Sequence, residues 1–252
     1  MKTIASKQLI TKKYKPSNKL IKYIDAYWSI ENLSKKSISI PIVPDGCMDI
    51  IYKNGELVFV GAMSESKIVE ILPDNYSFGI RFKPAVFAHL IKINSNQYIN
   101  KVVPLKSLSQ DLFNQIIINK NDELKTVDNL NQLFEPLFEK INFNEKIIKA
   151  IDRIISHQGD ISIKDLEEYI DLSNRQLRRL FQNYLGYPPK KFCNIVRFFD
   201  LFKELIKNNI DNLSSKAYEF GYCDQSHLNK EFKKFSNFFP THEMMSLFYK
   251  TK

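Results

Sequence analysis

Four polar side chains capable of binding nucleic acid recur at the spacing of one helix face: Arg175, Arg178, Arg179 and Gln182. At about 100° per residue they share one side of a helix, while Leu177 and Phe181 fall on the other. Guanidinium groups bind phosphates and guanine edges, and one helix fits the DNA major groove. A solvated charged surface has the same pattern, so this stretch alone leaves both interpretations open.

The residues around these arginines predict a helix, a tight turn and a second helix. Ser162 caps the first helix and Ser173 the second, because a serine side chain accepts a hydrogen bond from a free backbone amide there. Gly186 is placed to end the second helix, and Pro188-Pro189 prevents its continuation. The first unit therefore covers about 162–185.

A second copy of this pattern appears 51 residues further on. Leu177 corresponds to Leu228, Phe181 to Phe232, and the cap Ser173 to Asp224. Two such units within about one hundred residues are much less expected by chance than one. A helix over 189–207 joins the units at about 28 Å, close to the ~34 Å between successive major grooves on one DNA face. The second unit covers about 213–235.

These stretches resemble the DNA-binding domain of the AraC/XylS family of bacterial transcription regulators. The matching residues are S-N-R-Q-L-R-R-L-F (173–181), L-G-Y-P-P (185–189), Arg197 and A-Y-E-F-G-Y-C-D-Q-S-H-L-N-K-E-F-K-K (217–234). The resemblance implies an all-α domain over 145–252 with two helix-turn-helix units joined by a long helix. Two departures stand out: Lys216 lies where the family usually has an apolar residue, and Asn237 where it usually has glycine.

The resemblance also assigns DNA contacts, position by position. The base-reading positions are Arg175, Arg178, Arg179, Gln225, Ser226, Asn229 and Lys230. The phosphate-binding candidates are Asn174, Gln182, Lys190, Lys191 and Lys233. Arg197 is either a further contact or half of an ion pair with an acid of the same domain, such as Asp200 or Glu204. The short, uncharged Ser226 and Asn229 indicate weaker base reading in the second unit.

The pattern of the residues before 143 predicts an antiparallel sheet with helices. A short helix is expected over 18–25, followed by closely spaced strands between about 27 and 82. Asn54-Gly55 between two apolar runs predicts a hairpin with a type I′ turn. Helices are then expected from Pro84, near 107–118 and over 123–140. The fold class is α+β: a barrel-like N-terminal domain (1–143) and an all-α C-terminal domain (145–252).

The N-terminal half also resembles a sensor-type domain found ahead of AraC-type DNA-binding domains. The resemblance lies in P-D-G-C-M-D-I-I-Y (44–52), G-I-R-F-K-P (79–84) and V-V-P-L (102–105). It implies a module that responds to a small molecule or another signal. Candidate pocket residues combine charges and aromatic rings within apolar strand patterns: Trp28, Asp45, Asp49, Tyr52 and Arg81. Turn chemistry at Asp45 and a structural ion pair at Arg81 are the alternative interpretation.

Composition narrows the function classes. The net charge of +9 and isoelectric point near 9.2 suit a polyanionic partner. The three cysteines and four histidines are scattered, which argues against a metal centre, a disulfide framework or a cofactor site. Neither a secretory leader nor a membrane helix is expected, so we expect a cytoplasmic, nucleoid-associated protein without a membrane partner.

The sequence therefore predicts a sequence-specific, DNA-binding transcription regulator that is not an enzyme. Promoter DNA is the expected partner, and a small-molecule effector, RNA polymerase and a homodimer formed through 107–140 remain open. Two alternatives also remain: an enzyme with an attached DNA-binding domain, using a cysteine such as Cys47, and a non-specific architectural DNA-binding protein.

Overall fold

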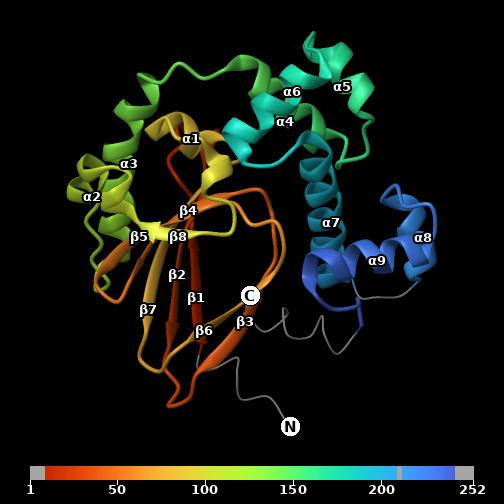
Figure 1. The fold of residues 1–252 in the computed structure, drawn as a ribbon. Helices are drawn as coiled ribbons and strands as arrows, with labels where there is room; N and C mark the ends of the chain where they lie inside the picture. The colour runs from red at the N-terminus through yellow and green to blue at the C-terminus, as the bar shows by residue number, and fades with distance from the viewer. Residues whose placement is uncertain (1–8, 209–211, 242–252) are drawn as a thin grey trace.

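The computed structural model describes residues 9–208 and 212–241, and in it a sheet-bearing N-terminal part lies beside a helical C-terminal part (Figure 1). We call these parts the N-terminal and C-terminal domains and keep the predicted boundary near Asn144. The outermost predicted residues, 1–8 and 242–252, lie outside the described residues, as do 209–211.

The N-terminal domain is built on a six-stranded antiparallel sheet with the order β1-β2-β7-β4-β5-β8. Its strands are β1 (Leu9–Tyr14), β2 (Ile24–Asn32), β4 (Met48–Lys53), β5 (Glu56–Val60), β7 (Tyr76–Phe82) and β8 (Val102–Pro104). A separate two-stranded ribbon joins β3 (Ile38–Ile42) to β6 (Lys67–Ile71). The predicted hairpin is confirmed, with β4 and β5 joined at Asn54 and Gly55, both at positive φ.

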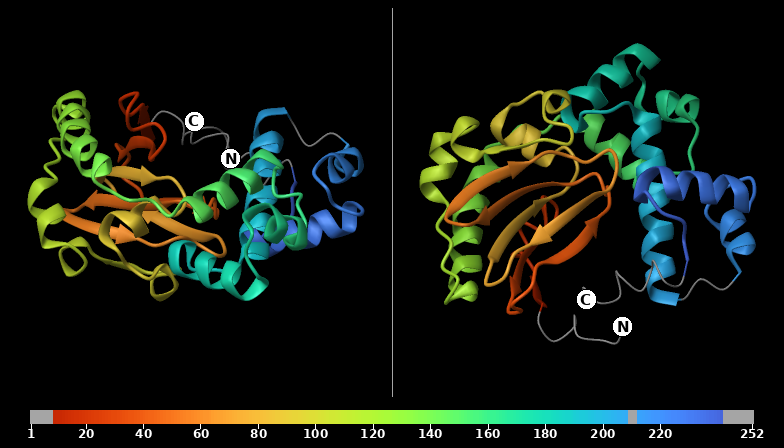
Figure 2. Two further views of the ribbon diagram at one scale, coloured as in Figure 1. Left: turned by 90° about the horizontal axis from the view of Figure 1, so that it is seen from above. Right: turned by 60° about the horizontal axis from the view of Figure 1, so that its bottom comes forward.

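Alternation along the strands gives the sheet two different faces. On one face Ile50, Phe59 and Phe78 are almost fully buried. The same face packs against α3 (Glu123–Glu139), whose Phe134 ring meets Phe82 edge-on. Figure 2 shows this helix beside the sheet. The opposite face, which carries Asp49 on β4, is left for the ribbon to cover.

One buried carboxylate fixes α3 to the edge of the sheet. Glu123, in the first turn of α3, accepts hydrogen bonds from Lys12 (2.7 Å), Tyr76 (3.0 Å) and Tyr14. Burial opposes the charge, but these donors hold the pKa of Glu123 down at about 2. Two shorter helices, α1 (Val86–Ile91) and α2 (Gln110–Gln115), complete the N-terminal domain.

The C-terminal domain consists of six described helices in the order expected for two helix-turn-helix units. They are α4 (Glu145–Ser156), α5 (Ile163–Ile170), α6 (Asn174–Leu185), α7 (Pro189–Asn208), α8 (Leu213–Glu219) and α9 (Gln225–Ser236). Helix α7 has 20 residues, about 30 Å at 1.5 Å per residue, and runs between the two units (Figure 1). Among the described residues no helix combines the length and apolar character that a bilayer span requires.

The two domains share one hydrophobic core. A single cluster of buried apolar side chains extends from Phe59 and Phe82 in the sheet to Leu177 in α6 and Phe232 in α9. Apolar residues of α3 such as Leu130 and Phe134 belong to it and pack inside this chain, whereas Leu124 is exposed.

Some expected elements differ from the structure. The helix expected over 18–25 is wrong: residues 18–23 form turns, and strand β2 begins at Ile24 because it pairs with β7. Strands β1 and β8 were not expected, and neither was α4. The helix expected near 107–118 is shorter, Gln110–Gln115.

Candidate nucleic-acid interface and adjoining pocket

Helix α6 is held by its caps and its apolar face. Ser173 and Gln176 form a reciprocal capping box, which satisfies backbone groups at the first turn. Gly186 ends the helix at φ 90°, a left-handed conformation that glycine adopts without a Cβ clash. Leu177 and Phe181 are fully buried, so the helix has one fixed rotation about its axis.

That rotation turns the three arginines outward. Arg175, Arg178 and Arg179 are exposed, and within the described ranges none of them makes a hydrogen bond or an ion pair. Asn174 instead donates to Glu167, and Gln182 is half-buried. The three guanidinium groups are therefore available to bind an anionic partner.

Helix α9 is capped and packed in the same way as α6, but it exposes different residues. Asp224 caps it, and Leu228, Phe232 and Phe235 are buried. The exposed residues Gln225, Ser226 and Lys230 contribute one positive charge. Asn229 is half-buried, and its Oδ1 atom has no hydrogen-bond partner among the described residues.

Buried and half-buried ion pairs connect α9 and α8 to α7. Arg197 lies 3.4 Å from Glu231 and donates to the carbonyl oxygen of Gly221 (3.0 Å). The expected ion pair with an acid of the same domain is therefore confirmed, but the partner is Glu231 rather than Asp200 or Glu204. Glu204 is instead bound to Lys216 at 2.7 Å, which explains how a lysine occupies a usually apolar position. Arg197 faces the protein interior.

The lysines proposed as phosphate ligands fall into two groups. Lys190 and Lys233 are exposed. Lys191 lies 4.6 Å above the Phe235 ring, and burial lowers its pKa, with the Lys234 charge acting in the same direction. Lys191 therefore lies between α7 and α9 rather than on the open surface.

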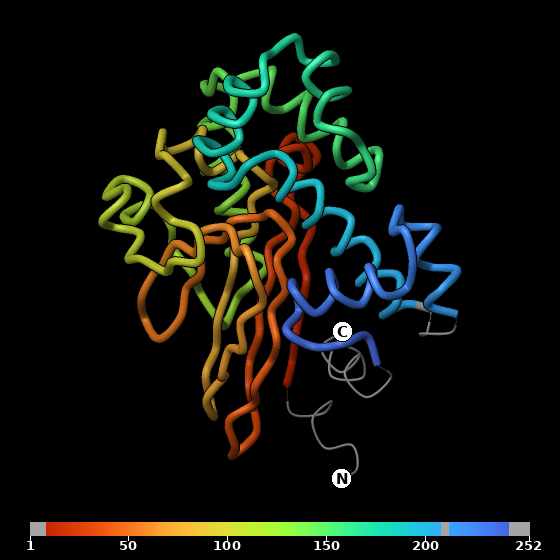
Figure 3. Tube along the Cα trace, turned by 45° about the vertical axis from the view of Figure 1, so that its right-hand side comes forward, coloured from red at the N-terminus to blue at the C-terminus, as the bar shows by residue number. Residues whose placement is uncertain are grey.

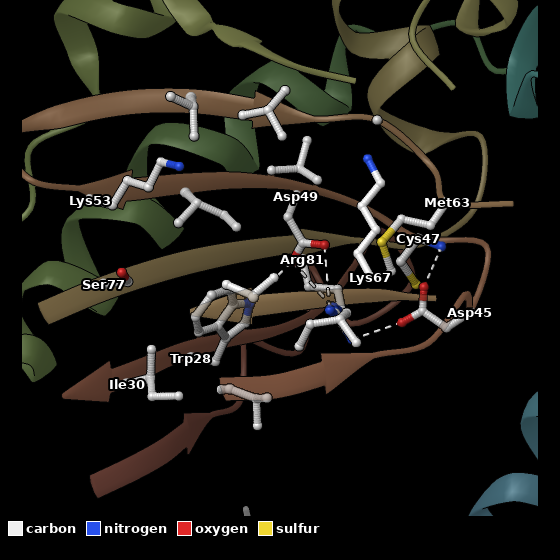
Figure 4. A pocket seen from close by; sticks show the side chains of 18 of the residues that line it. Trp28, Ile30, Asp45, Cys47, Asp49, Lys53, Met63, Lys67, Ser77 and Arg81 are labelled. Atoms are coloured by element: carbon white, nitrogen blue, oxygen red, sulfur yellow. Dashed lines mark hydrogen bonds and ion pairs between the residues drawn. The ribbon is translucent and has the colours of Figure 1, made fainter. Parts of the chain in front are cut away.

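A cavity of about 240 Å³ lies between the second face of the sheet and the β3–β6 ribbon (Figure 4). Its walls are largely aliphatic: Ile30, Ile40, Ile42, Ile51, Val58, Val60, Val69, Ile71 and Val102. Side chains from β2, β4 and β7 reach it because every second residue of a strand faces the same way. Apolar walls with a few polar groups are typical of small-molecule sites.

The polar part of the cavity is a cluster around Arg81. Its guanidinium lies 2.8 Å from Asp45 and 3.2 Å from Asp49, and the Trp28 indole donates to Asp49 at 3.1 Å. Figure 4 shows these side chains converging. Burial raises the pKa of Asp49 despite the opposing charge of Arg81. The cluster pairs two carboxylates with one guanidinium beside an apolar space.

Four of the five predicted pocket residues line this cavity, and Tyr52 does not. Tyr52 lies on the other face of β4, because Ile51 and Lys53 on either side of it face the cavity. Sequence reasoning missed the ribbon that closes the cavity, as well as Met63 and Lys67 in the β5–β6 segment. The parity of β4 would have excluded Tyr52, since it lies an odd number of residues from Asp49.

Comparisons with known proteins match both halves separately. Residues 166–243 match a helix-turn-helix domain family, and residues 12–104 match a domain of unknown function, DUF6597. A curated relative is the lactose operon transcription activator of Staphylococcus xylosus, 26% identical over 126 residues, which are 46% of this chain and 45% of the relative. The match thus spans less than half of that relative's length.

Similar solved structures include ToxT from Vibrio cholerae O395, with a TM-score of 0.44 and 14% identity, covering 96% of this chain and 98% of that one. A second structure of Vibrio cholerae ToxT has a TM-score of 0.45 and 13% identity over 95% of this chain and 98% of the other. The match over residues 166–243 agrees with the helix-turn-helix units expected from the resemblance of the C-terminal half to AraC/XylS regulators.

Proposed function

We propose that this chain regulates transcription by sequence-specific binding to promoter DNA, at the nucleoid of a bacterial cytoplasm. The observation that carries the proposal is the exposed face of α6. Three arginines that have no partner in residues 9–208 and 212–241 project from a helix fixed by buried residues in a helix-turn-helix frame. Arginine binds guanine edges in the major groove and phosphate oxygens, both of which this face can reach.

In this proposal the two recognition helices contribute unequally to DNA binding. Helix α6 reads bases through Arg175, Arg178 and Arg179. Helix α9 contributes Gln225, Ser226 and Lys230, while Asn229 is less accessible. Lys190 and Lys233 bind phosphates, and Lys191 contributes little because it packs on Phe235.

The cavity beside Arg81 is the proposed effector site. Its aliphatic walls suit a compact, largely apolar molecule, with a polar group that reaches Asp45, Asp49 and Arg81. Trp28 lines the cavity and is the only tryptophan in the chain. Its fluorescence therefore reports binding directly, and a shift that disappears in Ile51→Phe, which fills the cavity, assigns a ligand to this site.

The cysteine-enzyme alternative requires a thiol that loses its proton easily. Burial acts in the opposite direction, raising the pKa of Cys47 well above its ordinary value and that of Cys193 to about 11. The thiolate that such chemistry needs is therefore disfavoured at both residues.

Selection of bound duplexes from random DNA by the full chain, near physiological salt, tests the proposal. A recovered site with two short elements about one helical turn apart supports reading by both helices. One element alone would restrict base reading to α6. No enrichment, together with affinity that collapses as salt rises, would support the architectural alternative instead.

A further inference from the structure

The effector cavity shares its wall segments with the contact between the two domains. Asp45 and Cys47 line the cavity, and Gly46 between them lies against the C-terminal domain. A Cβ atom at Gly46 would lie 2.8 Å from the Phe192 ring at the start of α7. Any displacement of this loop by a bound molecule would therefore press on α7.

The segment between β5 and β6 makes the most polar of these contacts. Ser66 donates its backbone N–H to Phe235 (2.9 Å) and its hydroxyl to the Ser236 carbonyl (2.8 Å). The Asn237 side chain donates to the Ser66 hydroxyl oxygen at 2.7 Å. We call these bonds the Ser66–Asn237 latch. They hold the carboxyl end of α9 against the sheet domain, and Figure 3 shows the two chain segments meeting.

Residues on both sides of Ser66 line the cavity, so the latch and the effector site share one short segment. Met63 precedes Ser66, and Lys67 follows it directly. The segment is also braced by Asn100, another cavity residue. Ser64 donates its backbone N–H to Asn100 Oδ1 (2.8 Å), and Asn100 returns a bond to the Ser64 hydroxyl (2.9 Å).

The same brace continues to the first recognition helix. Ile99 precedes Asn100 and packs against Gly186, where a Cβ atom would lie 2.4 Å from Ile99 Cδ1. Ser95 donates its hydroxyl to the Tyr184 carbonyl at 2.9 Å. Both recognition helices thus end beside segments whose neighbouring residues, Lys67 and Asn100, line the cavity.

The latch gives a reason for the unusual Asn237. This residue ends α9 at φ 67°, where the family usually has glycine. Asparagine tolerates the left-handed conformation less readily than glycine, but it supplies an amide that glycine lacks. Here that amide reaches Ser66, so the departure from the family pattern creates a bond between domains.

We propose that the Ser66–Asn237 latch transmits occupation of the cavity to the second recognition helix. This inference rests on the proposed function, since it takes the cavity as the effector site and α9 as a DNA-binding element. A ligand shifts an equilibrium only by binding one state better than the other. Opening the latch carries a definite cost, because a buried Ser66 that loses its partners leaves polar groups unsatisfied until it finds others.

A double-mutant cycle on the full chain tests this inference without an identified effector. Val60→Phe fills the cavity from β5, and Asn237→Gly removes the amide while keeping a residue suited to the left-handed conformation. Asn54→Gly is the matched control, since Asn54 has φ 52° in an exposed turn far from α9. Binding is measured to a duplex selected by the unmodified chain.

We expect Val60→Phe to change DNA affinity by at least about fivefold in the unmodified and Asn54→Gly backgrounds. In the Asn237→Gly background the change should fall to within about twofold, because the latch no longer connects cavity and helix. An equal change in all three backgrounds would overturn the latch. No change in any background, with a folded protein by circular dichroism, would overturn the coupling as a whole.

Ile51→Phe fills the same cavity from β4 and replaces Val60→Phe if that variant does not fold. Hydrogen exchange of the Ser66 amide gives a readout that needs no DNA. It should accelerate at least about tenfold in Asn237→Gly and not in Asn54→Gly, and unchanged exchange would overturn the latch. Failure to select any duplex would count against the proposed function alone, since the exchange measurement still decides the latch.

Discussion

Helices α6 and α9 have equivalent caps and buried positions but differ in the residues that they expose. Both are capped by a short polar side chain and packed through equivalent apolar positions, Leu177 and Phe181 in one, Leu228 and Phe232 in the other. Helix α6 exposes three arginines that have no partner among the described residues, whereas the corresponding positions of α9 are Ser226, Asn229 and Lys230, with one positive charge. The two helices therefore share their packing positions and differ in their exposed faces.

The attachments of the two helices differ as well. The end of α6 meets the N-terminal domain mainly through rings and aliphatic groups, with His89 stacked on Tyr184 at 4.1 Å. The end of α9 is tied by directional hydrogen bonds at Ser66. We therefore propose that α6 supplies most of the affinity and that α9 is the more controllable unit.

The largest effect is expected when the ion pair that holds α9 against α7 is removed. Arg197→Ala leaves Glu231 buried without its partner, which typically costs about 3–5 kcal/mol. Urea denaturation of the full chain should show this loss. Lys203→Ala, which removes an exposed pair with Asp200, should cost less than about 1 kcal/mol. Similar losses in the two variants would contradict a structural role for Arg197.

The next effect concerns α6. Replacing both Arg178 and Arg179 by alanine should weaken specific binding about ten- to hundredfold, because one bidentate arginine–guanine contact contributes about 1–3 kcal/mol. The control is Lys149→Ala with Lys164→Ala, which removes two positive charges from exposed positions on α4 and α5. Equal losses in the two double variants would reduce the role of α6 to net charge.

A smaller effect is expected on α9. Lys230→Ala should weaken binding by less than about tenfold, equally for all sequences, and lower the salt slope by about one. The measurement is affinity as a function of salt on selected and scrambled duplexes. A change of base preference in the second element would contradict the assignment of Lys230 to phosphate.

The smallest expected effect is a pH dependence of stability that arises at the attachment of α6 and not at that of α9. Burial lowers the pKa of His89, and His89 Nε2 accepts the Asn144 amide at 3.0 Å. The unfolded chain therefore binds the proton first, so stability is full above the ordinary histidine pKa of 6.5 and declines as pH falls below it. His89→Gln, which cannot titrate, should lose this dependence between about pH 7 and 5.5. The same urea midpoints in both proteins at both pH values would exclude the effect.

Local chemistry made helices α5, α6 and α9 predictable. Ser173, Asp224 and Gly186 are caps whose effect depends on a few neighbouring residues, and the apolar spacing repeats every turn. The partner of Arg197 was not predictable in this way, because Glu231 lies 34 positions later and meets Arg197 only after α9 has packed.

In the N-terminal domain, sequence reasoning missed the features that depend on pairing between strands far apart in the sequence. The Asn54-Gly55 hairpin was predictable because its signal is local. Strand β1 contains Lys12 and Lys13, so its alternation is weak, and its strand state comes from pairing with β2. The same pairing of β2 with β7 overrode the helical appearance of 18–25.

The continuous core has a consequence for how such regulators diversify. Tyr187 and Phe192 are buried and lie against Gly46 of the N-terminal half, and Gly186 admits Ile99 only because it lacks a side chain. Moving this DNA-binding half onto an unrelated sensor would expose those rings and leave a mismatched seam. Recombination that exchanges whole halves is therefore disfavoured here, and we expect new specificities to evolve by point substitutions on α6 and in the cavity wall.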